Sequence, residues 1–424
     1  MLLGKDDALG LLPVKKQERM EKLKYQKEIM ITAVMAAVIF ALRLLNVFQV
    51  ENGLAHPLVM LLMIVGSSLL AIWLQRDMDA NYAHQRLYYP NLNILKYVCA
   101  VLIVILHLRP FLGYSSKLDL AFNNILSRIC VPVFFLITGY FVAQKEKTNP
   151  TYIRSYIQKN IHLYLVWSMI YIPVSVYFAF TNRHVIDLYI PSLSFPLYAL
   201  IPLVILGLPL ILIFYTGTYY HLWYFPAVIL SLIVVAQWKK RWSLGWLLVI
   251  SFVLLLFGAT ETYYGVLPLT LQRIISYYYN IFFTTRNFLF FGLFYVVLGY
   301  YLGSKKQVYA SYCLEKLLIS IMLLVFEALL LQGTERLNSN ILLACVPVTY
   351  YLFVCTIYLS NHHQKHLPFG ELSKYYYLIH PIVIVLVTAF PLHPLLQLLV
   401  VLLLTQLVSY GLYRLKRKHP SLPI

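Results

Sequence analysis

The chain has 424 residues, of which 61% are hydrophobic and only 12% are charged, and its mean hydropathy is +0.73. This composition excludes an ordinary soluble globular protein and indicates a membrane protein with many spans. The formal net charge of +18 is also typical of nucleic-acid binding, but the distribution of the basic residues along the chain favours another explanation.

Apolar stretches long enough to cross about 30 Å of hydrocarbon recur from residue 28 onward. The first 27 residues are polar and basic and lack the apolar core and cleavage site of a secretory signal. We expect a cytoplasmic N-terminus at 1–27, two additional helices within 28–85, a membrane domain at 86–415 and a cytoplasmic tail at 416–424. The predicted spans are 28–48, 54–74, 91–109, 121–143, 161–180, 221–237, 243–258, 286–303, 311–331, 340–359, 373–390 and 394–413.

Segment 196–216 is also apolar enough to cross, but a crossing would put the Lys239-Lys240-Arg241 cluster outside. Keeping it on the outer side, as a re-entrant segment, leaves most of the 34 Lys and Arg residues in loops on one side, as the positive-inside rule requires. The sequence therefore predicts an all-α polytopic protein of a bacterial plasma membrane with both termini in the cytoplasm. The basic charge reflects topology and some attraction to membrane lipid, and we expect no nucleic-acid binding.

Two ionisable residues share one face of the third span. Lys96 and His107 are 11 residues apart, which is about three helical turns and about 16 Å along the axis. Ionisable groups in a membrane helix are costly and face a bundle interior or a water-filled cavity. The pair therefore predicts a polar path through most of the membrane, with the histidine near its outer end.

Other spans bring polar residues to the same outer layer. Arg128 lies about two turns into its span, His221 opens the sixth span, and Arg286 opens the eighth. A histidine can take a proton from an attacking hydroxyl, and arginines can bind phosphate or stabilise an oxyanion, so this layer suits acyl transfer. Taken singly, each residue has a structural alternative: a hydrogen-bonded histidine, or an arginine that snorkels to the interface. His380 is expected at mid-depth.

Two further groups of residues are less specific. The outer loop 259–285 carries Glu261 and many tyrosines, which suit sugar faces but also suit an interfacial aromatic belt. The five cysteines fall in or near spans without paired spacing, so we expect them to be packing residues. No metal-binding spacing is present, and we expect no metal.

Several motifs match a known family in order and approximate spacing. They are Lys96 to His107, Arg128-Ile-Cys-Val-Pro132-Val-Phe134-Phe135, Thr138-Gly139-Tyr140-Phe141, His221-Leu-Trp223-Tyr224, Thr285-Arg286-Asn287 and Tyr377-Leu-Ile-His380-Pro381. Over residues 86–415 the chain resembles the acyltransferase type 3 family of integral membrane proteins. In its sequence motifs it is similar to the membrane half of vancomycin-resistance serine racemases and to stand-alone envelope O-acetyltransferases.

The resemblance implies a ten-helix core and transfer of an acyl group, often acetyl from cytoplasmic acetyl-CoA, to a hydroxyl of an envelope glycan or lipid. On this pattern His107 is the general base, Arg128 binds charge, and His221 is a second acid/base or an orienting group. Lys96 stands where the family usually has arginine. We expect the acyl-CoA to contact Lys96, Arg286 and His380, and the acceptor to contact Trp223, Tyr224, Asn287 and Glu261.

Three points stay open at this level. No carboxylate that orients His107 can be identified, although Asp119 and Glu261 lie on the correct side. The acyl group is passed to the acceptor directly or through a separate extracytoplasmic protein. A transporter for a small polar solute, such as an amino acid, is the alternative function, although no internal repeat supports it. A purely structural partner in an envelope complex is disfavoured by the cost of the buried polar groups.

Overall fold

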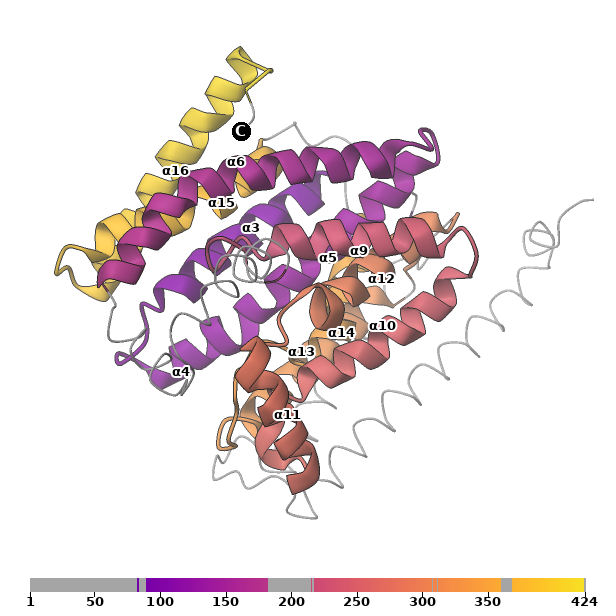
Figure 1. Ribbon diagram of the computed structural model, residues 1–424, viewed down its shortest axis with the longest axis horizontal. Helices are drawn as coiled ribbons and strands as arrows, with labels where there is room; N and C mark the ends of the chain where they lie inside the picture. Colours follow the sequence, from indigo (N-terminus) through magenta and orange to yellow (C-terminus); the bar gives the residue numbers. More distant parts are fainter. Residues whose placement is uncertain are drawn as a thin grey trace, which may run out of the picture.

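A computed structural model describes residues 82–83, 89–181, 215, 217–306, 308–310, 312–359 and 368–422. Over these residues the protein is a bundle of helices, as predicted for an all-α polytopic membrane protein (Figure 1). The basic N-terminus, the two additional helices and nearly all of the re-entrant segment 196–216 lie outside the described residues.

Each of the ten spans predicted from residue 91 onward is a helix. Two of them begin with a short π-helical segment (η3 and η8). The helices are α3 (Pro90–Leu108), η3 (Leu120–Leu126) continued by α5 (Ser127–Glu146), α6 (Tyr152–Thr181), α9 (Tyr224–Trp238), α10 (Leu244–Ala259), η8 (Phe288–Gly292) continued by α12 (Leu293–Ser304), α13 (Cys313–Leu330), α14 (Cys345–Tyr358), α15 (Phe369–Thr388) and α16 (Pro394–Lys418). Among the described helices, three are long and apolar enough to cross a membrane: Pro90–Leu108, Ser116–Glu146 and Pro394–Lys418.

The structure differs from the prediction in small elements between the spans. The expected outer loop 259–285 contains a helix, α11 (Leu269–Phe282), after a 3-10 turn, η7 (Tyr264–Val266). An amphipathic helix of this kind has no long apolar run, so hydropathy alone does not predict it. A one-turn helix, α4 (Ser116–Asp119), precedes η3, and two short strands, β1 (Tyr82–Ala83) and β2 (Val308–Tyr309), pair antiparallel.

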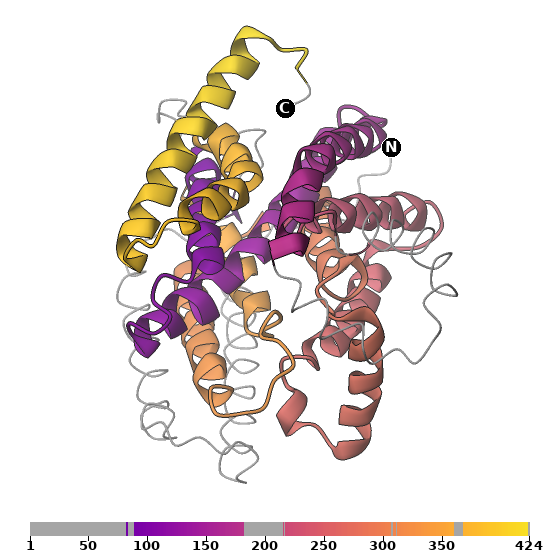
Figure 2. The same cartoon turned by 60° about the vertical axis from the view of Figure 1, so that its left-hand side comes forward.

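Helix α5 lies at the centre of the bundle. It packs against α3, α6, α9, α12 and α14, while α15 and α16 lie together on the far side of α3 (Figures 1 and 2). Both views place α4 and α11 at the same end of the molecule, which is the end where α3 finishes.

Glycines allow α5 and α12 to approach more closely than other residues would. A Cβ atom added to Gly139 of α5 would lie 2.1 Å from the Val296 oxygen, and one added to Gly299 of α12 would lie 2.0 Å from the Leu136 oxygen. Small residues at such crossings are a general feature of helix packing in membranes, where close van der Waals contact drives association.

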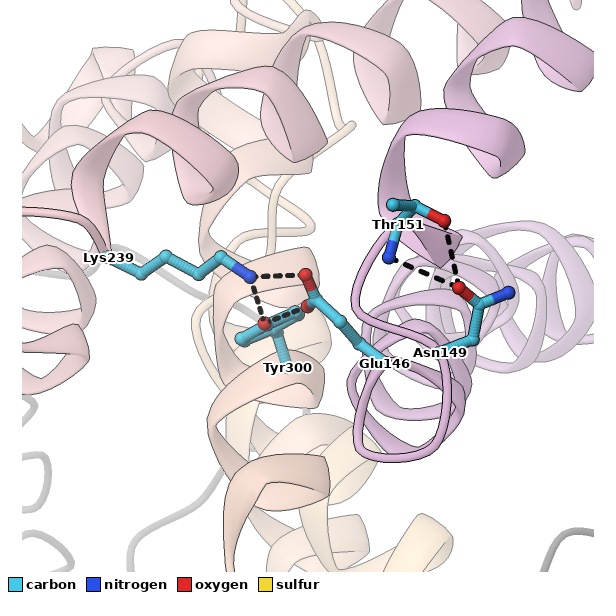
Figure 3. A network of polar contacts seen from close by, with 5 residues as sticks. All are labelled: Glu146, Asn149, Thr151, Lys239 and Tyr300. Atoms are coloured by element: carbon cyan, nitrogen blue, oxygen red, sulfur yellow. Dashed lines mark hydrogen bonds and ion pairs between the residues drawn. The ribbon is translucent and has the colours of Figure 1, made fainter.

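A charged cluster links the C-terminal ends of α5, α9 and α12. Glu146 ends α5 and forms an ion pair with Lys239, which follows α9. Tyr300 of α12 donates a hydrogen bond to Glu146 and accepts one from Lys239 at 3.1 Å (Figure 3). Beside it, the Asn149 side chain accepts hydrogen bonds from the Thr151 amide and hydroxyl, which shape the turn into α6. Helices α5, α9 and α12 therefore run in the same direction.

Candidate functional site

A cavity of about 700 Å³ extends through the bundle between α3, α5, α6, α9 and α15. One part of its wall, the histidine end, carries His107, Arg128, His221, Trp223 and Arg286. The other part, the lysine end, is lined by residues that include Asn93, Lys96, Lys145, Lys159 and Lys374. Because Lys96 and His107 lie on the same helix about 16 Å apart, the cavity follows the polar path that their spacing predicts.

Three histidines form a cluster at the histidine end. The ring of His107 stacks on that of His380, with centroids 5.4 Å apart and an interplanar angle of 16°. The ring of His221 lies edge-on to His380 at 5.7 Å. His380 and His221 are buried, whereas His107 keeps part of its surface toward the cavity.

Helix α15 positions this cluster. The Nδ1 atom of His380 lies 2.8 Å from the Tyr376 oxygen; because a carbonyl only accepts, we assign the hydrogen to Nδ1, which leaves Nε2 as an acceptor. One turn earlier, the Tyr377 hydroxyl donates a hydrogen bond to the His221 backbone oxygen.

His221 was expected to open a span, but it lies in the turn before α9. That turn requires Gly217, whose φ is +75° and whose added Cβ would lie 2.7 Å from the Leu222 carbonyl carbon.

Both arginines lie beside π-helical segments, which often occur at functional sites. Arg128 follows η3, and its Nη1 donates a hydrogen bond of 3.3 Å to the Asn340 side chain. Arg286 precedes η8, and its guanidinium lies 5.2 Å from the centre of the Trp223 ring. Within the described ranges, neither forms an ion pair with a carboxylate, and their Nε atoms are buried without a hydrogen-bond partner. Two arginines that form no ion pair within the described residues thus face the cavity.

Glu261 and Asn287, predicted to contact the acceptor, lie beside the cavity rather than on its wall. Glu261 is 1% exposed and accepts hydrogen bonds from the Asn340 side chain at 2.9 Å and from the Thr285 amide and hydroxyl at 2.5 and 2.8 Å. Asn287 caps η8 by accepting from the amides of Leu289 and Phe290. Both side chains hold the backbone that precedes η8.

Neither of the two carboxylates suggested for orienting His107 does so. Asp119 pairs with Arg109 at 2.9 Å and with Asn123 at 2.5 Å, and Glu261 is engaged as described above. The ring contacts of His107 are instead with His380 and with Tyr220, whose centroid lies 4.7 Å away.

The lysine end is strongly basic. Lys145 of α5, Lys159 of α6 and Lys374 of α15 join Lys96 on the wall, together with the carboxylate of Glu371. Gly370 brings α15 close to α3, since an added Cβ would lie 2.3 Å from the Asn93 side-chain oxygen and 3.1 Å from the Lys96 Nζ. Such a cluster of cations suits phosphate groups.

The model of the acyltransferase domain family matches residues 89–414. The chain belongs to this family of membrane acyltransferases. It is also similar to two amino-acid racemases of Enterococcus faecalis. One is 26% identical over 347 residues, 77% of this chain and 46% of that protein. The other is 24% identical over 300 residues, 68% of this chain and 38% of that protein.

A serine/alanine racemase of Enterococcus gallinarum is 24% identical over 298 residues, 67% of this chain and 39% of that protein. The chain thus spans less than half the length of these curated relatives. No solved structure matches it.

The fold brings most of the predicted site residues together. His107, Arg128, His221, Arg286, Trp223 and Tyr224 share one cavity with Lys96. His380 lies against His107 rather than deeper along the path, because Gly370, ten residues earlier in α15, is level with Asn93 and Lys96. Sequence reasoning missed Asn340 and the lysines at 145, 159 and 374; the only available signal was their position at span ends.

Proposed function

We propose that this membrane acyltransferase transfers an acyl group, most simply acetyl, from acyl-CoA to a hydroxyl of an extracytoplasmic envelope glycan or glycolipid. The observation that carries the proposal is one cavity with a lysine cluster at one end and a histidine–arginine cluster at the other. The pantetheine arm of acyl-CoA separates its phosphates from its thioester in the same way. The proposal puts the phosphates among the lysines and the thioester carbonyl beside His107.

The reaction then needs a base and a site for the developing negative charge. His107 takes the proton of the acceptor hydroxyl as the hydroxyl oxygen attacks the thioester carbonyl carbon. The guanidinium groups of Arg128 and Arg286 stabilise the resulting oxyanion. When the intermediate collapses, the carbon–sulfur bond breaks and the CoA thiolate leaves with the proton held by His107. His380 orients the His107 ring by stacking on it, and His221 supports that arrangement.

The same assignment gives the orientation of the protein. Acyl-CoA is cytoplasmic, so the lysine end faces the cytoplasm, and the histidine end faces the outer surface where an envelope acceptor arrives. Both chain termini then lie in the cytoplasm of a bacterial cell, in agreement with the distribution of Lys and Arg along the chain.

Transport of a small polar solute is the second candidate. It is favoured by a polar cavity along the bundle. The curated relatives are named amino-acid and serine/alanine racemases, so the transported solute would be an amino acid. A transporter has no use for an acyl donor, so consumption of acyl-CoA separates the two functions.

The deciding experiment uses membranes that contain the wild-type protein or the His107→Ala variant, with radiolabelled acetyl-CoA supplied on the cytoplasmic face. We expect alkali-labile label in the glycan or lipid fraction with the wild type and none with the variant. His162→Ala is the matched control, because His162 is an exposed residue of α6. Equal labelling by the wild type and His107→Ala contradicts the role of His107. No consumption of acetyl-CoA by folded wild-type protein contradicts acetyl transfer.

A further inference from the structure

A chain of hydrogen bonds connects a buried carboxylate to a partly buried guanidinium at the histidine end. The Nδ2 atom of Asn340 donates to Glu261 Oε1 at 2.9 Å, and Arg128 Nη1 donates to Asn340 Oδ1 at 3.3 Å. An amide therefore stands between the anion and the cation, which would otherwise be free to form a salt bridge.

The amide satisfies both neighbours without carrying charge. Its oxygen accepts from the guanidinium and its nitrogen donates to the carboxylate, so one uncharged side chain bonds to both groups through two separate atoms. Glu261 is further bound by Thr285, so its charge is stabilised without Arg128. The negative charge stays one residue away from the cavity wall.

The backbone around Asn340 is fixed, so the amide cannot be displaced easily. The Ile341 amide donates to the Thr262 hydroxyl at 3.2 Å, and the amides of Leu343 and Ala344 donate to the Glu327 carboxylate at 2.6 and 2.8 Å. Asn340 itself is 8% exposed.

We propose that Asn340 is a positioning residue: it holds the Arg128 guanidinium on the cavity wall while keeping the Glu261 carboxylate from neutralising it. Arg128 is then an uncompensated cation that takes an anionic oxygen, either a charged group of a bound substrate or the oxyanion of the transition state. An uncompensated cation in a low-dielectric cavity attracts such an oxygen far more strongly than a salt-bridged one. This inference deepens the proposed function and rests on it for the identity of the anion.

The test is an exchange of the two side chains, Glu261→Gln together with Asn340→Asp. The exchange keeps the shape, the net charge and a matching donor and acceptor at every hydrogen bond of the pair, but it puts a carboxylate directly on Arg128. We expect the double variant to keep the wild-type thermal midpoint and to lose acyl transfer by about tenfold or more. Asn340→Asp alone puts two carboxylates face to face, and Glu261→Gln alone turns an amide nitrogen toward a donor of Asn340 or Thr285, so we expect both to be less stable than the double variant.

Kinetic constants tell the two anions apart. A rise in KM for one substrate indicates that Arg128 binds a charged group of that substrate, and a fall in kcat with unchanged KM indicates the oxyanion. Asn149→Asp adds a carboxylate in the turn after α5, where its oxygen can still accept from Thr151, and serves as the control. It should leave transfer unchanged.

A second readout does not depend on acyl transfer and so survives failure of the proposed function. In the wild-type background, Arg128→Met removes an uncompensated cation, and we expect the thermal midpoint to stay the same or rise. In the exchanged background the same substitution leaves the carboxylate introduced by Asn340→Asp without its cation, and we expect the midpoint to fall. Full activity of the exchanged variant, or an equal effect of Arg128→Met in both backgrounds, overturns the inference.

Discussion

The same three helices carry opposite kinds of polar cluster at their two ends. At their C-terminal ends, Glu146, Lys239 and Tyr300 of the α5, α9 and α12 segments bond to one another (Figure 3). At the histidine end, Arg128 and Arg286 flank the same helices with no carboxylate bound to either in the described part of the chain. Removing one partner of a paired charge destabilises a bundle, whereas a charge left unpaired at a cavity costs stability by itself and indicates a functional role.

The first prediction disturbs both clusters at once, because it forces apart the helices α5 and α12 that pack between them. In Gly299→Ala the new methyl group would lie 2.0 Å from the Leu136 oxygen, so α5 and α12 must separate. We expect a loss of about 2–4 kcal/mol of stability together with loss of transfer. Gly411→Ala in α16 is the control, because nothing lies within 4 Å of its added Cβ.

The thermal midpoint in detergent and the yield of monodisperse protein measure this effect. Gly411→Ala should be neutral or slightly stabilising, by up to about 1 kcal/mol, because alanine favours a helix more than glycine does. Equal midpoints for the two variants would show that the close approach of α5 and α12 is not needed.

The second prediction acts on the histidine end alone. Arg128→Met removes a cation that faces the cavity, and we expect transfer to fall by about 100-fold or more without a loss of stability. Initial rates of label transfer and the thermal midpoint are measured on the same preparation. A clear drop in midpoint would mean that Arg128 holds the bundle together, as Glu146 does at the other end.

The third prediction acts on the cluster of Glu146, Lys239 and Tyr300 alone, which does not line the cavity. Glu146→Gln weakens the bonds to Lys239 and Tyr300 and leaves the lysine without its ion-pair partner, so we expect a loss of about 1–3 kcal/mol of stability. Transfer per folded molecule should not change. Adding Lys239→Met removes the unpaired cation and should recover part of the loss, which a double-mutant cycle of thermal midpoints checks.

The contrast between the two ends also marks the limit of what the sequence predicts. Hydropathy predicted a helix at each of the ten places described from residue 91 onward, and the placement of polar residues at helix ends predicted that His107, Arg128, His221 and Arg286 would meet. These features depend on one helix at a time and on the side of the membrane each end faces.

What the sequence could not predict depends on how far one helix is shifted along another. His380 was expected midway along the path, but the contact of Gly370 with Asn93 sets α15 at a level that stacks His380 on His107. Asn340 lies in a loop that reaches Arg128 across 212 residues of sequence, and no local pattern indicates such a contact.

The last prediction concerns one contact at the histidine end, between the Trp223 ring and the Arg286 guanidinium. Trp223 packs against Phe135 and Phe291, and its ring faces the Arg286 guanidinium at 5.2 Å. Trp223→Phe keeps an aromatic ring but weakens the cation–π attraction by about 0.5–1 kcal/mol, so we expect a two- to fivefold effect on transfer. Trp242→Phe, at an exposed tryptophan near the lysine end, is the control and should have no effect.

Because the ring orients Arg286 and bears no charge, the salt dependence of the rate discriminates between two explanations of any loss. If the ring only positions the cation, Trp223→Phe lowers the rate by the same factor at low and high salt, since the charge of Arg286 is retained. If the ring shields the cation from water, the loss grows with salt, because ions screen an exposed guanidinium far more than a buried one. A rate equal to that of the wild type at every salt concentration would show that Trp223 does not orient Arg286. The backbone before η8 would then be what positions Arg286.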